Sequence, residues 1–168
     1  MTMRDFQYCP MCKGVLIQKH IDERIRKICS LCGWINYRNP VPVIACLVSN
    51  DNGDILLIKR AIEPCIGAWA IPGGFIEIDE DIKTAGVREL KEETGLQGIP
   101  GRIVGVHLEY NPIYDFVLVI GMEFLIDTFQ TVKAGDDASD AKFIPRTSLP
   151  QIPFESHRKL IADFCDTV

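Results

Sequence analysis

Short apolar runs separated by turn-forming residues recur along most of the chain, and this pattern predicts strands. The expected strands cover 15–20, 24–29, 43–48, 55–58, 69–71, 102–109, 116–126 and 128–133. Two segments carry helical spacing instead, 81–93 and 155–165, and Gly95 follows the first of them as a left-handed C-cap. Strands that surround one helix and precede another predict an α/β layered domain.

Paired cysteines set the first forty residues apart from the rest. Cys9 and Cys12 form one C-x2-C pair, and Cys29 and Cys32 form a second pair after sixteen intervening residues. Two pairs at this spacing are typical of a tetrahedral Zn²⁺ site, and the alternation between them predicts a short hairpin. A segment this short builds little core, so bound zinc would supply stability that packing lacks.

The stiff run Asn-Pro-Val-Pro at 39–42 is expected to be a linker. The expected organisation is therefore a zinc ribbon at 1–38 and a second domain at 39–168. The glycines that follow the second cysteine of each pair are expected to let the turn curl, so that backbone N–H groups point at the thiolates.

Composition excludes several classes of protein. The 168 residues are 47% hydrophobic and 24% charged, which is ordinary for a globular protein. We expect neither a membrane span nor a secretory signal, and hence a cytoplasmic protein, because the apolar runs are short and the first ten residues are polar. A net charge of −5 argues against strong nucleic-acid binding. The charge is uneven, since residues 1–40 hold seven basic and three acidic residues.

The first expected helix carries three glutamates on one face. At about 100° per residue, Glu89, Glu92 and Glu93 fall within an arc of roughly 100°. Like charges at this spacing repel each other, and a hard divalent cation removes the repulsion because it prefers oxygen ligands. We expect this face to be exposed, with Ala85 beside it leaving room for the metal.

The residues around that helix also form a motif. From residue 74 to 96 the chain reads G-x5-E-x7-R-E-U-x-E-E-x-G-U, where U is a bulky aliphatic residue. This motif resembles the Nudix box of the Nudix hydrolases. The resemblance implies an α/β/α sandwich around a mixed sheet, over about residues 41–165. It also implies a metal-dependent enzyme that directs water onto a phosphorus of a nucleoside diphosphate derivative.

The resemblance assigns roles within the box. Glu89, Glu92 and Glu93 correspond to the carboxylates that bind catalytic Mg²⁺ or Mn²⁺, and the backbone carbonyl of Gly73 or Gly74 corresponds to a further ligand. Arg88 is expected to hold a box carboxylate in place by hydrogen bonds. Glu80, at the helix entry, is expected to suit the helix dipole.

The general base is less well determined by the sequence. In this family an acid downstream of the box, on a loop before the last strand, often serves as the base. Asp137 and Asp140 are the corresponding candidates here, and Glu92 of the box competes with them.

Recognition of the substrate is assigned to two groups of residues. Lys59 and Arg60 end an expected strand close to where phosphates would lie. Tyr110 and Tyr114 either stack a base or belong to the core. Pro112 lies sixteen residues after the box, a spacing found in ADP-ribose-cleaving members, whereas Tyr114 has a spacing found in dinucleoside-polyphosphate members.

A four-cysteine ribbon ahead of a Nudix domain resembles the NADH pyrophosphatase branch and related proteins that act on FAD or ADP-ribose. The S-Q-P-W-P-F-P run of the NADH branch does not follow the box here, so ADP-ribose or FAD is favoured. Two alternatives stay open: a module that senses a nucleotide or RNA while the ribbon docks a partner, and a house-cleaning triphosphate pyrophosphohydrolase. The expected partners are a small-molecule nucleotide and a second copy in a homodimer, with no membrane.

Overall fold

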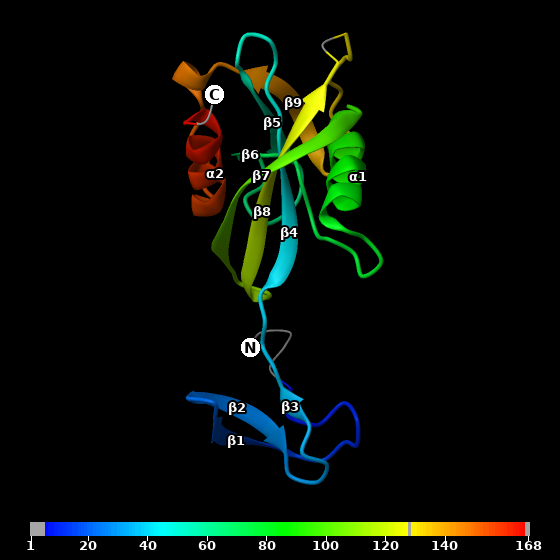
Figure 1. Ribbon diagram of the computed structural model, residues 1–168, viewed down its shortest axis with the longest axis vertical. Coiled ribbons are helices and arrows are strands. Elements are labelled where there is room, and N and C mark those ends of the chain that lie inside the picture. Colours follow the sequence, from blue (N-terminus) through cyan, green and yellow to red (C-terminus); the bar gives the residue numbers. More distant parts are fainter. Residues whose placement is uncertain (1–5, 128, 167–168) are drawn as a thin grey trace. The chain divides into compact units, whose positions relative to one another are not determined.

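A computed structural model describes residues 6–127 and 129–166 of the chain (Figure 1). The first of its two units combines the residues up to Pro40 with Tyr110–Phe116. The second combines Val41–Glu109 with the residues from Val117 onwards. No helix among the described residues has the length and apolar character that crossing a membrane requires.

The first unit is built on a three-stranded antiparallel sheet. Its strands, in spatial order, are β1 (Leu16–Ile21), β2 (Arg24–Cys29) and β3 (Ile35–Asn36). Asp22 and Glu23 form the two-residue turn between β1 and β2, and both have positive φ (50° and 61°), as hairpin turns of this length require. The hairpin expected between the cysteine pairs is confirmed, and β3 adds a short third strand to it.

The second unit contains two three-stranded sheets that together give it a mixed α/β architecture. One sheet has the order β4 (Val41–Leu47), β8 (Asp115–Ile126), β7 (Gly98–Asn111). The other has the order β6 (Trp69–Ala70), β5 (Ile55–Arg60), β9 (Ala138–Ile144). Strands β4 and β8 run parallel, from Val41 opposite Val117 to Leu47 opposite Glu123, whereas β5 pairs antiparallel with both neighbours.

Two helices, α1 (Ile82–Thr94) and α2 (Glu155–Cys165), lie on opposite sides of these strands (Figure 1). A 3₁₀ turn, η1 (Arg146–Ser148), precedes α2. Helix α1 begins after Asp81, whose carboxylate accepts hydrogen bonds from the amides of Lys83 and Thr84, and it ends at Gly95 with φ of 73°. The layered fold and the glycine C-cap are confirmed, while the residue that caps the N-terminus is Asp81.

The main core lies between α1 and the β4–β8 sheet. Leu90 of α1 is fully buried there with Ile44 and Phe124. Gly86 makes the close contact of the helix with the sheet, because a Cβ at this position would stand 2.3 Å from Cζ of Phe124. Ala85 is also fully buried in this core. The expectation that Ala85 faces the metal is therefore wrong, since the sheet covers that side of the helix.

Two local expectations are also wrong. Residues 129–133 form no strand, because the loop that contains them bonds to the end of α1: the amide of Lys133 donates to the carbonyl of Thr94 at 2.9 Å. Val41 and Pro42 belong to β4 and not to a linker, because β8 supplies a parallel partner that no local pattern reveals. A proline is tolerated there because β4 is the edge strand of its sheet.

Candidate active site and cysteine cluster

The three glutamates on one face of α1 differ in their exposure. Glu93 is 5% exposed, the side chain of Glu89 is 14% exposed, and that of Glu92 is 44% exposed. The expected uniformly exposed acidic face is thus wrong, because α1 turns Glu93 toward the sheet and only Glu92 toward solvent. Two of the three carboxylates are therefore held in surroundings that exclude most water.

Arg88 binds the carboxylates around it. Its Nε and Nη2 donate to the two oxygens of Glu80 at 2.6 and 2.8 Å, a bidentate pair. Its Nη1 donates to Glu89 at 2.7 Å and to Glu92 at 3.1 Å. The Glu80 pair lowers the pKa of that carboxyl below its usual value, so Glu80 stays charged and fixes the guanidinium. One cation therefore sets the positions of three carboxylates.

At two glycines the backbone closely approaches the carboxylates of Glu89 and Glu93. The amide of Gly73 donates to Oε2 of Glu93 at 2.8 Å. Gly73 has φ of 150°, and a Cβ there would stand 2.0 Å from the carbonyl oxygen of Ile44. A Cβ on Gly74 would stand 2.3 Å from Oε1 of Glu89. Only glycine fits at position 73, and a side chain on Gly74, the first residue of the motif, would displace the carboxylate of Glu89.

Burial changes the protonation of the two inner glutamates. Desolvation raises the pKa of Glu93 to about 8, against the hydrogen bond from Gly73, and desolvation also raises the pKa of Glu89 above its usual value. Keeping such carboxylates charged requires a counter-ion. A hard divalent cation suits this donor set, since Mg²⁺ and Mn²⁺ bind through carboxylate and carbonyl oxygens.

The raised pKa of Glu93 predicts a pH-dependent affinity for Mg²⁺. Without metal the folded chain keeps the Glu93 proton up to about pH 8, whereas the unfolded chain releases it near the ordinary value of 4.5. The stability of the metal-free protein attributable to Glu93 therefore falls as pH rises through this window, and Mg²⁺, which needs the ionised form, binds more tightly. We expect titration calorimetry to show the Kd for Mg²⁺ falling by up to about tenfold per pH unit below pH 8. A Kd that keeps the same pH slope in Glu93→Gln would contradict this assignment.

Of the two basic residues expected near the phosphates, Arg60 is held most firmly. Its Nε donates to the carbonyl of Pro64 at 2.7 Å, and its guanidinium lies 5.6 Å from the ring centre of Phe154. The positive charge of Arg60 acts on Glu93 and lowers the pKa of its carboxyl, against the larger effect of burial. Lys59 precedes it on β5, where its carbonyl accepts a hydrogen bond from Ser139. The structure thus brings Arg60 to the side of the unit that carries Glu93.

Phe154 and His157 lie near Arg60, and neither was assigned to the site from the sequence. Their rings lie 5.1 Å apart, and Nδ1 of His157 accepts a hydrogen bond from the amide of Ile71 at 3.1 Å. Burial, assisted by the charge of Arg60, lowers the pKa of His157 to about 4, so the imidazole is neutral at pH 7. No spacing in the sequence links Phe154 to Arg60, because the contact joins the end of β5 to the start of α2.

The two aspartates expected on one loop lie in different settings. Asp137 immediately precedes β9, where its carbonyl accepts from the amide of Ala61 at 2.7 Å, and its negative charge helps to raise the pKa of Glu93. Asp140 is part of β9 and forms an ion pair with Lys142 at 3.5 Å. The loop position expected for Asp140 is therefore wrong, because β9 begins at Ala138.

The predicted base-stacking segment belongs to the first unit. Tyr110 is exposed, and its ring meets that of Phe116 edge to face at 5.8 Å. Asn111 caps the turn that follows by accepting from the amides of Ile113 and Tyr114. Pro112 is exposed between them. The roles given to Tyr110, Pro112 and Tyr114 stay predictions.

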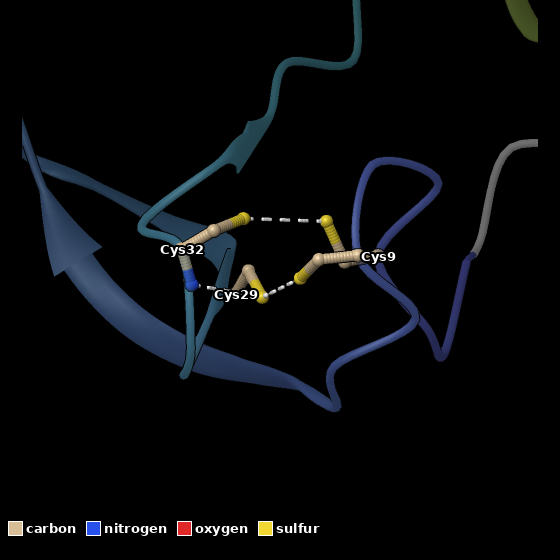
Figure 2. Close-up of side chains that lie close together, drawn as sticks. Cys9, Cys29 and Cys32 are labelled. Carbon is tan, nitrogen blue, oxygen red and sulfur yellow. Dashed lines mark hydrogen bonds between the residues drawn. The ribbon is translucent and has the colours of Figure 1, made fainter.

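The four cysteines of the two pairs gather at one point of the first unit. The sulfur atoms of Cys9, Cys12, Cys29 and Cys32 all lie within 4.8 Å of one another. Figure 2 shows Cys9, Cys29 and Cys32 with their side chains turned toward one another. The Sγ atoms of Cys9 and Cys32 are 3.7 Å apart, and those of Cys12 and Cys29 are 3.4 Å apart. A tetrahedral ZnS₄ centre with bonds of about 2.3 Å has sulfurs about 3.8 Å apart, so the cluster fits this metal.

The backbone around Cys29 favours the thiolate form of this residue. Hydrogen bonds from backbone amides, first that of Cys32, lower the pKa of Cys29 to about 6. Gly14 is required at this point, because a Cβ there would stand 2.9 Å from Sγ of Cys29. In the second turn Gly33 takes the left-handed conformation at φ 76°, as expected, whereas in the first turn Lys13 takes it at φ 63°.

Comparison with known proteins identifies the family of this chain. A family model described as "NUDIX domain" matches residues 39–164. An ADP-ribose pyrophosphatase of Methanocaldococcus jannaschii is 38% identical over 89% of this chain and 87% of its own length. A crystal structure of a NUDIX hydrolase from Nitrosomonas europaea is 26% identical, with a TM-score of 0.71 over 93% of this chain and 88% of that one.

A second kind of relative shares only part of its length with this chain. The NAD-capped RNA hydrolase NudC of Vibrio atlanticus is 28% identical over 89% of this chain, which spans 53% of that protein. A bifunctional NMN adenylyltransferase/ADP ribose pyrophosphatase from Francisella tularensis is 26% identical, with a TM-score of 0.61 over 77% of this chain and 42% of that one.

Proposed function

The chain belongs to the Nudix hydrolase family and is a pyrophosphohydrolase, and we propose that its substrate is ADP-ribose or a closely similar nucleoside diphosphate derivative such as FAD. The observation that carries the proposal is the burial of Glu93 against the Gly73 amide, together with the largely buried Glu89 of the same helix. Such an arrangement serves a metal-dependent reaction and is costly without one.

The M. jannaschii relative supports the choice of substrate. It carries the name ADP-ribose pyrophosphatase and aligns over 89% of this chain and 87% of its own length. The first alternative, a binding module, has no need of carboxylates that are costly to ionise, and the second, a triphosphate pyrophosphohydrolase, lacks a supporting feature of equal weight. Cleavage of ADP-ribose would give AMP and ribose 5-phosphate.

The box residues supply the positioning for this reaction. Glu89 and Glu93 would hold Mg²⁺ or Mn²⁺, with Glu92 and the Gly73 carbonyl as further ligands, and Arg88 keeps Glu89 and Glu92 oriented. A divalent cation bound here would neutralise phosphate oxygens and lower the pKa of a bound water.

The proton of the attacking water needs an acceptor. Glu92 is the more exposed box carboxylate and is held by one hydrogen bond of 3.1 Å from Arg88, so it retains freedom to accept a proton. Asp137 competes for this role because its charge already acts on Glu93, and Asp140 is the weaker candidate because Lys142 pairs with it.

Substrate contacts are proposed for the residues outside the box. Arg60 is held by the carbonyls of Glu63 and Pro64 and lies over Phe154. Arg60 and Lys59 would supply positive charge to the phosphate oxygens. Tyr110, Pro112 and Tyr114 are proposed to contact the group beyond the pyrophosphate. The division into a zinc ribbon at 1–38 and a hydrolase domain at 39–168 is kept as part of this proposal, with Zn²⁺ structural in the ribbon.

A panel of substrates tests the proposal. With Mg²⁺ present, we expect kcat/KM for ADP-ribose or FAD to exceed that for each common nucleoside triphosphate by at least about tenfold, a difference of about 1.4 kcal/mol in transition-state binding. NADH and a diadenosine polyphosphate complete the panel. A triphosphate that leads by this margin would place the chain among house-cleaning enzymes, and activity on none of them would favour the binding module.

A further inference from the structure

The sheet of the first unit contains a notch at the free edge of β2. Strand β3 pairs with β2 only at Lys27 and Ile28, so the backbone of β2 before Lys27 has no partner on that side in the described sheet. A cavity of about 210 Å³ occupies this edge. The chain that leaves β3 closes its other side at Arg38. The notch therefore follows from the shortness of β3.

Cations dominate the lining of the notch. Four of its residues are basic and two are amides, and no acidic residue lines it within the described structure: Arg24, Arg26, Lys27, Arg38, Gln18 and Asn36. Successive residues of a strand point to opposite faces, so Arg26 and Lys27 flank the notch from both sides of the sheet. Asp115 offsets part of this charge through its ion pair with Arg38.

Arg26 shows that the notch is incomplete as a hydrogen-bonding site. Its Nε is buried, and no acceptor for it is present among the described residues. Its guanidinium lies 4.8 Å from the ring centre of Tyr37, a cation–π contact that fixes the group without supplying an acceptor oxygen. A buried donor without a partner is costly, and an anionic oxygen at this position would remove the cost.

We propose that this notch binds the phosphodiester backbone of single-stranded nucleic acid. The cavity is smaller than the roughly 300 Å³ that a small-molecule site usually offers, so it accommodates a phosphate and leaves the rest of its ligand outside. Tyr37, 55% exposed, lies beside it as a ring on which a base can stack. A chain of several phosphates would also contact Lys19, the residue of β1 that lies opposite Arg26. A single phosphate in the notch would not reach Lys19.

Charge restricts this binding to the ribbon. The residues after position 40 hold eleven basic and twenty acidic residues, so they repel a polyanion that the hairpin attracts. The net charge that argued against strong nucleic-acid binding is thus a property of the second unit. The notch contains no residue of the hydrolytic site, so the proposal stands apart from the proposed substrate.

The test measures binding of a labelled oligouridylate of about twelve nucleotides, a usual site size, to the full zinc-loaded chain by fluorescence anisotropy. We expect the logarithm of the binding constant to fall with the logarithm of salt concentration with a slope of about −2, as for three neutralised phosphates of a single strand. In the double variant Arg24→Gln, Arg26→Gln we expect a slope of about −0.7 and at least tenfold weaker binding at low salt. Lys159→Gln, which changes an exposed lysine of α2 outside the notch, is the matched control, with a loss of less than about threefold.

Zinc content shows whether the ribbon of the double variant has folded. If it has not, Gln18→Glu, which places a negative charge in the notch on the exposed strand β1, serves in its place and should weaken binding by a similar factor. Absence of binding by the unaltered chain, or equal losses in the double variant and in Lys159→Gln, would overturn the proposal. Displacement of the oligonucleotide by inorganic phosphate or AMP at an equal phosphate concentration would also overturn it, since the ligand would then be a small phosphate. None of these outcomes depends on ADP-ribose hydrolysis.

Discussion

Replacing Glu93 by glutamine should lower kcat/KM at saturating Mg²⁺ by about a hundredfold or more, equivalent to at least about 2.7 kcal/mol of transition-state stabilisation. The amide keeps the shape of the side chain and can still accept the hydrogen bond from Gly73, but it removes the charge that a cation requires. The same change should leave the metal-free protein at least as stable above pH 8, because a buried carboxylate whose pKa is raised to about 8 is costly to ionise. Loss of activity with retained or increased thermal stability is therefore the expected signature.

Two further variants are needed to interpret the effect of Glu93→Gln. Glu89→Gln should cause a similar loss of kcat/KM, since Glu89 lies against Gly74 and receives a hydrogen bond from Arg88. Glu155→Gln is the matched control, because Glu155 is exposed on α2, where it forms an ion pair with Lys159. If either box variant kept more than about a tenth of the activity, a loss below about 1.4 kcal/mol, the assigned ligands would be wrong.

Removal of metal from the cysteine cluster should unfold the ribbon and leave hydrolysis intact. The buried residues of this unit are Cys9, Leu16 and Cys29, with Trp34 packed against them, so two of the three core side chains are candidate ligands. Structural zinc contributes about 10–16 kcal/mol of apparent binding free energy in comparable small sites, far more than this core supplies. The double variant Cys29→Ser, Cys32→Ser should lose about one zinc per chain, and trypsin should cut its hairpin at least about a hundredfold faster.

Cys65→Ser is the control for this experiment, because Cys65 is an exposed thiol outside the cluster. Metal analysis and limited proteolysis of the two proteins, side by side with ADP-ribose hydrolysis in Mg²⁺, complete the measurement. A wild-type chain free of zinc, or a hydrolytic rate that follows added zinc in place of magnesium, would show that the cluster has another role.

The box helix could be predicted from sequence because its signals are local. Its charge spacing, its motif and its C-cap at Gly95 all lie within one short segment. The ribbon hairpin could be predicted for the same reason, since its alternating apolar residues and its two-residue turn are contiguous in the sequence. In both cases the residues that specify the structure are neighbours along the chain.

The orientation of that helix could not be predicted in the same way. Helical spacing shows which side chains share a face, but it does not show which face the sheet covers. Ala85 and Glu93 illustrate this: one lies in the core instead of at the metal, and the other is 5% exposed instead of open to solvent. The parallel pairing of β4 with β8 joins residues more than seventy positions apart, and it decides both outcomes.

The close contact of Gly86 with Phe124 means that α1 must satisfy two requirements: it must pack against the sheet, and it must place the carboxylates. A side chain at position 86 would collide with the ring, and α1 would have to move away from the sheet together with every carboxylate that it carries. Gly86 has no side chain that could bind a metal. If substitutions were scored by turnover, changes at position 86 would nevertheless resemble changes at the metal ligands. Loss of activity on substitution in this enzyme therefore identifies residues that position α1 as well as residues that bind the metal.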